Sequence, residues 1–195
     1  MTVSTSIRKA GRKIAKTEAR IARVAAPRAG SAPEQVVATI GKLGDQPELR
    51  TLAAVVLAGG LLGANRRLLR TGIRMLLAHE LATLGKDLIK GRIDRTRPHS
   101  AESRSDRAVK PGRNTAKSKT SFPSGHSAGS VAVARAVGRE YPQLQAPALA
   151  AAAIVGGLQV PRLAHYPSDV AAGMIVGAAA EAAAGLILPR GGDDS

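Results

Sequence analysis

Two histidines stand beside residues that would let them act on a phosphate group, and the first is His126. It directly follows Pro123-Ser124-Gly125, a pattern typical of a helix N-terminus. The free N–H groups of such a terminus and the Ser124 hydroxyl form a natural phosphate cradle, and Gly125 lets an anion approach the backbone. His126 would lie in the first turn, where the helix dipole disfavours its protonated form unless an anion is near. A bound phosphate would supply that anion and make His126 a candidate general acid.

The second histidine, His165, has a carboxylate four residues further on, in the segment His165-Tyr-Pro-Ser-Asp169. Pro167 predicts a helix start, which would bring Asp169 within reach of the imidazole. A carboxylate that accepts a hydrogen bond from one imidazole nitrogen leaves the lone pair of the other free to attack. The alternative is a capping aspartate with an unrelated histidine nearby, and this pair alone does not decide between them.

A pair of cations, Lys90 and Arg97, precedes both histidines in the order Lys-x6-Arg-Pro. Lys90 is expected to end a helix, and Arg97 is expected to be extended because Pro98 follows it. Two cations held near each other favour an anion between them. The alternative for this segment is a solvated basic loop.

Together the three segments resemble the type 2 phosphatidic acid phosphatase superfamily, which also contains bacterial acid phosphatases and vanadium haloperoxidases. The first two motifs match in full, over residues 90–98 and 123–126. The third family motif reads Ser-Arg-x5-His-x3-Asp, and only its second half matches, because Leu158 and Gln159 replace Ser-Arg. The resemblance covers roughly residues 50–188.

The resemblance implies metal-independent hydrolysis of a phosphate monoester or diphosphate, without a cofactor and without a metal site. In that mechanism His165 attacks phosphorus and forms a phosphohistidine, which Asp169 orients and stabilises. His126 protonates the leaving oxygen and then activates water. The residues expected to hold the phosphate oxygens are Lys90, Arg97, Ser124, Gly125 and Arg162.

Arg162 enters this set as a substitute for the missing family arginine. Gln159 carries no charge, and Arg162 lies three residues on, one helical turn later and on a similar face. The alternative is a phosphatase-like protein with weakened or altered activity.

Charge and composition narrow the class of protein further. The 195 residues include 29 Lys+Arg, 14 Asp+Glu and no Cys, with a net charge of +15 and 44% apolar residues. The lack of cysteine excludes disulfides, thiolate metal sites and a cysteine nucleophile. Only three aromatic residues argue against a protein that stacks on single-stranded bases, and the apolar content argues against a disordered basic tail.

The N-terminal segment, residues 1–48, predicts a basic amphipathic helix that contacts an anionic membrane surface. Alternatives are a solvated basic helix or a targeting presequence. No secretory signal peptide is expected, because no apolar run follows the basic start. The expected apolar stripe comprises Val3, Ile7, Ala10, Ile14, Thr17, Ile21 and Val24.

The rest of the chain predicts an all-α fold: a membrane-embedded bundle of about five core helices behind the basic N-terminal helix. A soluble Ala-rich bundle is the alternative. Ser31 and Asp45 mark helix starts, residues 91–124 form a long loop, and Gly173-x3-Gly177 favours close helix packing. A bundle at 49–189 and a tail at 190–195 complete the expected organisation. The expected helices lie near 51–65, 71–88, 126–138, 147–161 and 170–188.

Apolar helices beside a phosphate site favour a lipid phosphate substrate: polyprenyl phosphate or diphosphate, phosphatidate, phosphatidylglycerol phosphate or a polyprenyl-linked sugar phosphate. The expected partners are this substrate and anionic lipids that contact the N-terminal helix, with no nucleic acid; the oligomeric state stays open. The expected location is the inner membrane, crossed several times. A haloperoxidase is disfavoured because those enzymes are larger.

Basic residues favour a site that faces the cytoplasm, although superfamily lipid phosphatases often face the periplasm instead. Residues 1–50 and 86–119 hold 10 and 11 Lys+Arg, against four in 66–74, and the first two segments fall on one side if five helices span. The competing class is a non-enzymatic basic protein that binds anionic membrane or nucleic acid.

Overall fold

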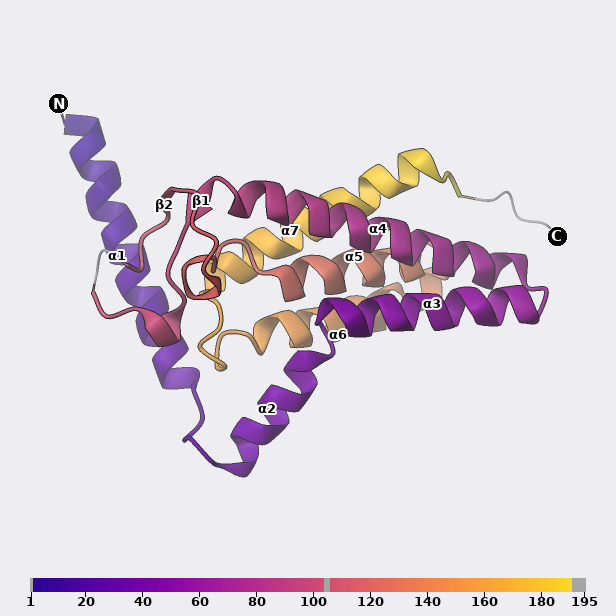
Figure 1. The fold of residues 1–195 in the computed structure, drawn as a ribbon, viewed down its shortest axis with the longest axis horizontal. Coiled ribbons are helices and arrows are strands. Elements are labelled where there is room, and N and C mark those ends of the chain that lie inside the picture. Colours follow the sequence, from indigo (N-terminus) through magenta and orange to yellow (C-terminus); the bar gives the residue numbers. More distant parts are fainter. Residues whose placement is uncertain (1, 104–105, 191–195) are drawn as a thin grey trace.

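Five α-helices form the bundle in the computed structural model, which describes residues 2–103 and 106–190, with side chains from residue 13 onward. The central helix, α5, packs against α4, α6 and α7, and α3 packs against α4 (Figure 1). The all-α fold with about five core helices is therefore confirmed. The bundle helices are α3 (Gln46–Leu62), α4 (Arg66–Lys90), α5 (Gly125–Glu140), α6 (Gln145–Gly157) and α7 (Pro167–Ile187).

Two helices precede the bundle, α1 (Thr2–Ala25) and α2 (Ala32–Lys42), and both lie at its left end in Figure 1. The N-terminal helix was expected, but the face it buries is not the isoleucine stripe. Ile14 and Ile21 are exposed, whereas Glu18 and the alanines around it are buried. The side chains of Val3, Ile7 and Ala10 lie outside the described residues. The buried face of α1 comprises Ala15, Glu18, Ala19 and Ala22.

Both expected helix starts are confirmed, although their caps differ. Ser31 is the N-cap of α2, and its Oγ accepts a hydrogen bond from the Glu34 N–H at 3.4 Å. Asp45 is the N-cap of α3, but its side chain makes no capping hydrogen bond. The Asp45 carboxylate is therefore available for a contact elsewhere.

Three expected helix boundaries were wrong. The helix expected near residues 51–65 corresponds to α3 and ends at Leu62. The helix expected from residue 71 corresponds to α4 and begins at Arg66. The reason is a tight turn in which Ala64 has φ of 48° and the Asn65 side chain accepts from Leu68 N–H at 2.9 Å. Near the other end of the chain, α6 ends at Gly157 instead of continuing to residue 161.

The loop between α4 and α5 is long, as expected, but it is internally paired. Short strands β1 (Ile93–Asp94) and β2 (Lys110–Pro111) form an antiparallel pair. Backbone hydrogen bonds join Arg95 N–H to the Lys119 carbonyl at 2.9 Å and Arg97 N–H to the Ser118 carbonyl at 2.7 Å. These bonds hold the chain that carries Arg95 and Arg97. Short 3-10 turns occupy Pro98–Ser100, Lys117–Lys119 and Pro142–Leu144.

Two glycines allow α7 to lie directly against α5. A Cβ at Gly173 would fall 2.3 Å from the Ser124 carbonyl oxygen, and one at Gly177 would fall 2.2 Å from that of Ala128. Atoms cannot approach so closely, so both positions require glycine. The small-residue pattern therefore sets the distance between these two helices, as its spacing predicted.

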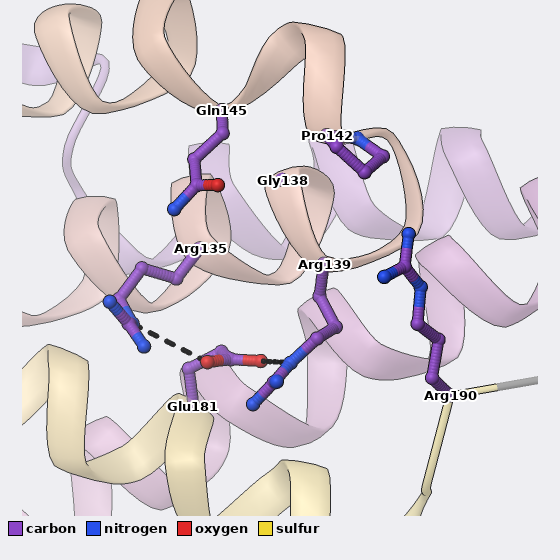
Figure 2. Close-up of a pocket in the computed structure, with 7 residues that line it drawn as sticks. All are labelled: Arg135, Gly138, Arg139, Pro142, Gln145, Glu181 and Arg190. Carbon is purple, nitrogen blue, oxygen red and sulfur yellow. Dashed lines mark hydrogen bonds and ion pairs between the residues drawn. The ribbon is translucent and has the colours of Figure 1, made fainter.

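Arginines and glutamates gather at the end of the bundle opposite α1. Figure 2 shows Arg135 and Arg139 on either side of Glu181, with ion-pair distances of 3.4 and 3.2 Å. The buried Arg74 lies 3.6 Å from the same carboxylate and 3.0 Å from Glu140. A carboxylate or a backbone carbonyl thus lies near five of the arginines at this end: Arg67, Arg70, Arg74, Arg135 and Arg139.

Among the described residues one helix, α7, is long and apolar enough to cross a membrane, with a mean hydropathy of 1.8 over the apolar window. Large apolar side chains are also exposed on the outer faces of the bundle. They include Leu52, Val55, Leu61, Leu62, Ile154, Ile175, Leu186 and Ile187. The expected tail at 190–195 lies outside the described residues except for Arg190.

Candidate active site

The three motifs, far apart in sequence, meet at the end of the bundle that faces α1. This end collects the C-terminus of α4, the N-termini of α5 and α7, and the turn after α6 (Figure 1). A backbone hydrogen bond of 2.9 Å from Ser124 N–H to the Asp169 carbonyl joins the starts of α5 and α7. The fold therefore brings the segments of His126 and His165 together.

The two histidines face each other across this end. Their ring centroids are 6.2 Å apart, with the ring planes at 64°. His165 is 1% exposed, and burial lowers its pKa to about 4, although Asp169 opposes the shift. His165 is therefore neutral at pH 7, the state that a nucleophilic imidazole needs.

Asp169 lies near His165 but bonds to other groups. The distance from its Oδ2 to His165 Nδ1 is 3.8 Å, which is longer than a hydrogen bond. The same carboxylate accepts hydrogen bonds from Arg95 Nη1 at 2.5 Å, Ser121 Oγ at 2.5 Å and Tyr166 N–H at 2.9 Å. Asp169 thus belongs to the capping box of α7, and the hydrogen bond expected from His165 is not formed, because His165 Nδ1 has no hydrogen-bond partner.

Ser124 and Gly125 form the expected start of α5. Ser124 is the N-cap, and its Oγ accepts from Ser127 N–H at 3.3 Å. A Cβ at Gly125 would lie 3.1 Å from the aliphatic chain of Lys86, so a second lysine borders the cradle. Sequence spacing did not single out Lys86, which is a helical turn before Lys90.

Lys90 and Arg97 are held by backbone carbonyls rather than by carboxylates. Lys90 Nζ donates to the Thr120 carbonyl at 2.8 Å, and Arg97 Nε donates to the Lys117 carbonyl at 2.8 Å. Burial lowers the pKa of Arg97. Carbonyls orient both cations without neutralising them, so their charge remains available to an anion.

Arg162 and Gln159 contact each other beside the N-terminal segment. Arg162 Nη1 donates to Gln159 Oε1 at 3.1 Å, and the Gln159 amide donates to the Val155 and Gly41 carbonyls at 3.0 and 3.3 Å. A Cβ on Gly41 would lie 2.7 Å from Arg162 Nη1. The buried Gln159 side chain therefore fixes the position of the Arg162 guanidinium.

Three acidic or polar residues at this end escaped the sequence interpretation. Asp45, the N-cap of α3, places Oδ1 at 2.6 Å from His126 Nε2. Glu18 of α1 places Oε2 at 2.7 Å from Arg95 Nη2, and Ser121 donates to Asp169. Ser121 lies two residues before Pro123 of the second motif, whereas no local spacing links Asp45 or Glu18 to the motifs. The sequence signal for Glu18 is that it is a lone acid among the basic residues of segment 8–23.

The arrangement suits in-line transfer of a phosphoryl group. A neutral imidazole, a second histidine and incompletely neutralised cations lie around one point, and such transfer requires little beyond positioning and charge stabilisation. Among the described residues, no group of three or more His, Asp or Glu side chains is placed to hold a metal ion.

Residues 71–190 match the family model of the PAP2 superfamily. This match spans more than half of the chain and includes all three motifs, so the chain belongs to the PAP2 superfamily. The resemblance inferred from the motifs is thereby confirmed.

The fold is also similar to one solved structure, described as the first transmembrane PAP2 type phosphatidylglycerolphosphate phosphatase from Bacillus subtilis. The TM-score is 0.64 at 22% identity, with 93% of this chain and 86% of that chain covered. A search of curated proteins found no match.

Proposed function

We propose that this protein hydrolyses a lipid phosphate or diphosphate, of polyprenyl or glycerophospholipid type, through a phosphohistidine intermediate. The supporting observation is the pair of histidine rings 6.2 Å apart at the end of the bundle. Membership of the PAP2 superfamily favours the phosphatase class, and the similar solved structure is named for an enzyme that acts on a phospholipid phosphate.

In the first step His165 attacks phosphorus through Nε2, since Nδ1 faces Asp169. A nitrogen–phosphorus bond forms as the bond from phosphorus to the leaving oxygen breaks, and His126 donates a proton to that oxygen. In the second step His126 takes a proton from water, whose oxygen attacks phosphorus and breaks the bond to His165. Inorganic phosphate leaves, and both histidines return to their starting states.

Fixed cations stabilise the phosphate oxygens in this mechanism, as magnesium does in other phosphoryl-transfer enzymes. Lys90 and Arg97 carry charge that carbonyl partners leave available. Arg162 adds a third cation in place of the family arginine, and the cradle of Ser124 and Gly125 supplies a hydroxyl and a backbone N–H. The proposed reaction therefore proceeds in the presence of EDTA, and vanadate inhibits it.

Phosphate release from a panel of lipid phosphates tests this function and identifies the substrate. The His165→Ala variant should release no phosphate, because the nucleophile is gone, whereas exposed His99 serves as a control whose alanine variant stays active. Turnover by the His165→Ala variant would refute the assignment.

The competing proposal is a basic protein that binds nucleic acid or anionic membrane without catalysis, or a phosphatase-like protein of weak activity. The net charge of +15 favours binding to polyanions. Such a binder would lose affinity steeply with salt and would be indifferent to His126→Ala. The proposed enzyme instead loses phosphate release in Lys90→Ala and His126→Ala.

We propose that the bundle lies in the inner membrane and crosses it several times. Contact with lipid is supported by α7, the one helix among the described residues that is long and apolar enough to span, and by the exposed apolar side chains of the bundle. The N-terminal helix would lie on the anionic surface through Ile14, Ile21 and Val24, which are exposed. The lipid tail would then stay in the bilayer while its phosphate reaches the site.

The excess of basic residues at the site end favours a site that faces the cytoplasm. Arginines are also present at the far end of the bundle, so the orientation needs a direct test. Because the chain has no native cysteine, a single Ser100→Cys variant reports which side of the membrane the site faces. An impermeant thiol reagent added to intact cells should leave this cysteine unlabelled; labelling would place the site outside. The far-end arginines are Arg66, Arg67, Arg70, Arg74, Arg135, Arg139 and Arg190.

A further inference from the structure

We propose that Glu18 of the N-terminal helix is a positioning residue for this reaction, acting through Arg95 on Asp169. The inference rests on the proposed function, because it assigns Asp169 to the stabilisation of His165. Glu18 lies outside the region that matches the family model, residues 71–190.

A continuous chain of short contacts runs from α1 to the site. Glu18 Oε2 lies 2.7 Å from Arg95 Nη2, and Arg95 Nη1 lies 2.5 Å from Asp169 Oδ1. The other Glu18 oxygen accepts from the Ser168 N–H at 2.8 Å. One carboxylate on α1 therefore holds both the arginine that contacts Asp169 and the backbone of α7 next to Asp169.

The three charged groups are all buried. Glu18 is 7% exposed, Arg95 is 2% exposed and Asp169 is fully buried. Charges removed from water interact strongly, and removing one partner of a buried set leaves the others poorly compensated. A surface ion pair would not transmit such an effect, whereas this set does.

The net charge of the set explains what Glu18 adds. Two carboxylates and one guanidinium sum to one negative charge, which faces His165 at 3.8 Å. Without the Glu18 charge, Arg95 would neutralise Asp169 alone. The positive charge that develops on His165 as it bonds to phosphorus would then lose its compensation, so formation of the phosphohistidine would slow.

Arg95 is itself held so that it cannot easily turn away. Its Nε donates to the Arg107 carbonyl at 3.0 Å, Nη1 donates to Ser168 Oγ at 2.8 Å, and the guanidinium lies 4.0 Å from the centroid of the Tyr166 ring. A change at Glu18 therefore alters the charge balance at Asp169 more than it alters the geometry.

The test compares Glu18→Gln, which removes the charge and keeps the size, with Glu102→Gln, which makes the same change at an exposed loop residue. Glu18→Gln should lower kcat about 10- to 100-fold, as loss of an outer-shell partner does. KM should stay within about twofold, because Glu18 contacts none of the groups that hold phosphate. Glu102→Gln should match the wild type.

A second variant keeps the test decisive if Glu18→Gln is poorly folded. Glu18→Asp retains the charge on a shorter side chain and should keep more of kcat than Glu18→Gln, with rates expressed per folded molecule from circular dichroism. A Glu18→Gln kcat equal to the wild type, or a Glu18→Asp kcat no higher than that of Glu18→Gln, would overturn the inference.

The same assay separates this inference from the proposed function. If the wild-type protein releases phosphate from none of the lipid phosphates, the proposed function is wrong. If the wild type is active, His165→Ala is inactive and Glu18→Gln is fully active, only the proposed role of Glu18 is wrong.

Discussion

At the level of single residues, the partner that a cation bonds to decides how much of its charge remains available. Lys90 and Arg97 donate to backbone carbonyls, whereas Arg74 at the far end lies against two glutamates. A carbonyl fixes the direction of a cation but leaves most of its charge uncompensated. Lys90 and Arg97 therefore keep oriented positive charge for an anion, whereas the charge of Arg74 is compensated.

Arg162 is predicted to supply the charge that the family arginine would otherwise supply. Arg162→Ala should lower kcat/KM about as much as Arg97→Ala does, on the order of 10²–10³-fold for a lost electrostatic donor. Phosphate-release kinetics of the two variants, with exposed Arg113→Ala as the control, measure this. A near-normal Arg162→Ala enzyme would show that Gln159 alone suffices.

His165 is predicted to stay neutral well below the usual pH for a histidine. Its pKa of about 4 in the folded protein lies below the ordinary value near 6.5, because burial disfavours the charged form. The stability that this group contributes is therefore fully present above about pH 6.5 and is lost as pH falls towards the folded pKa. NMR of ¹⁵N-labelled histidine, with the signal assigned from a His165→Gln variant, measures the titration. An apparent pKa near 6.5 would contradict it.

At the level of elements, the packing of α5 on α7 fixes the distance between the two histidines. Each helix carries one histidine at or just before its first turn, and the glycines of α7 bring the backbones into contact. A change in this contact would therefore move His126 relative to His165 without touching either.

Gly177→Ala is predicted to destabilise the bundle by about 1–3 kcal/mol, as overpacking does, and to lower activity. The added Cβ would lie 2.2 Å from the Ala128 carbonyl oxygen, so the helices must separate. Gly157→Ala is the matched control, because no atom lies within 4 Å of its Cβ. Thermal unfolding and phosphate release of both variants give the comparison; equal behaviour would mean that the interface yields without moving the site.

At the level of the whole molecule, the two ends of the bundle use charge differently. The site end holds cations for an anion, while the far end ties α4, α5 and α7 together through Glu140 and Glu181, both buried. The far-end cluster therefore stabilises the bundle.

Glu181→Gln is predicted to lower the free energy of unfolding by about 3 kcal/mol, because breaking a buried pair leaves cations uncompensated. Glu181 is 1% exposed and lies within 3.6 Å of Arg74, Arg135 and Arg139. The control is Glu80→Gln, whose pair with Arg50 is about half exposed and should contribute less than about 1 kcal/mol. Denaturant unfolding of both variants tests the difference, and equal losses would argue against a structural role for the cluster.

The helical class, the order of the core helices and the motif residues that meet at the site could all be predicted from the sequence. Hydrophobic spacing, prolines before helix starts and the glycine pair are local signals, so they can be recognised in the sequence alone. The break at Ala64 was missed because the uncharged run continues up to Arg66, although Gly63 and Asn65 are local signals for a helix end and a helix start.

The groups that surround the motifs follow from long-range packing and could not be predicted from the sequence. Asp45 and Glu18 reach His126 and Arg95 from a segment more than 70 residues away in sequence, and spacing carries no information about such contacts. Tertiary packing also decided that α1 buries Glu18 and exposes Ile14, because a helix buries the face that fits its neighbour rather than its most apolar face. The motifs thus predict the chemistry of the site, whereas long-range contacts determine how the charges of the site are balanced.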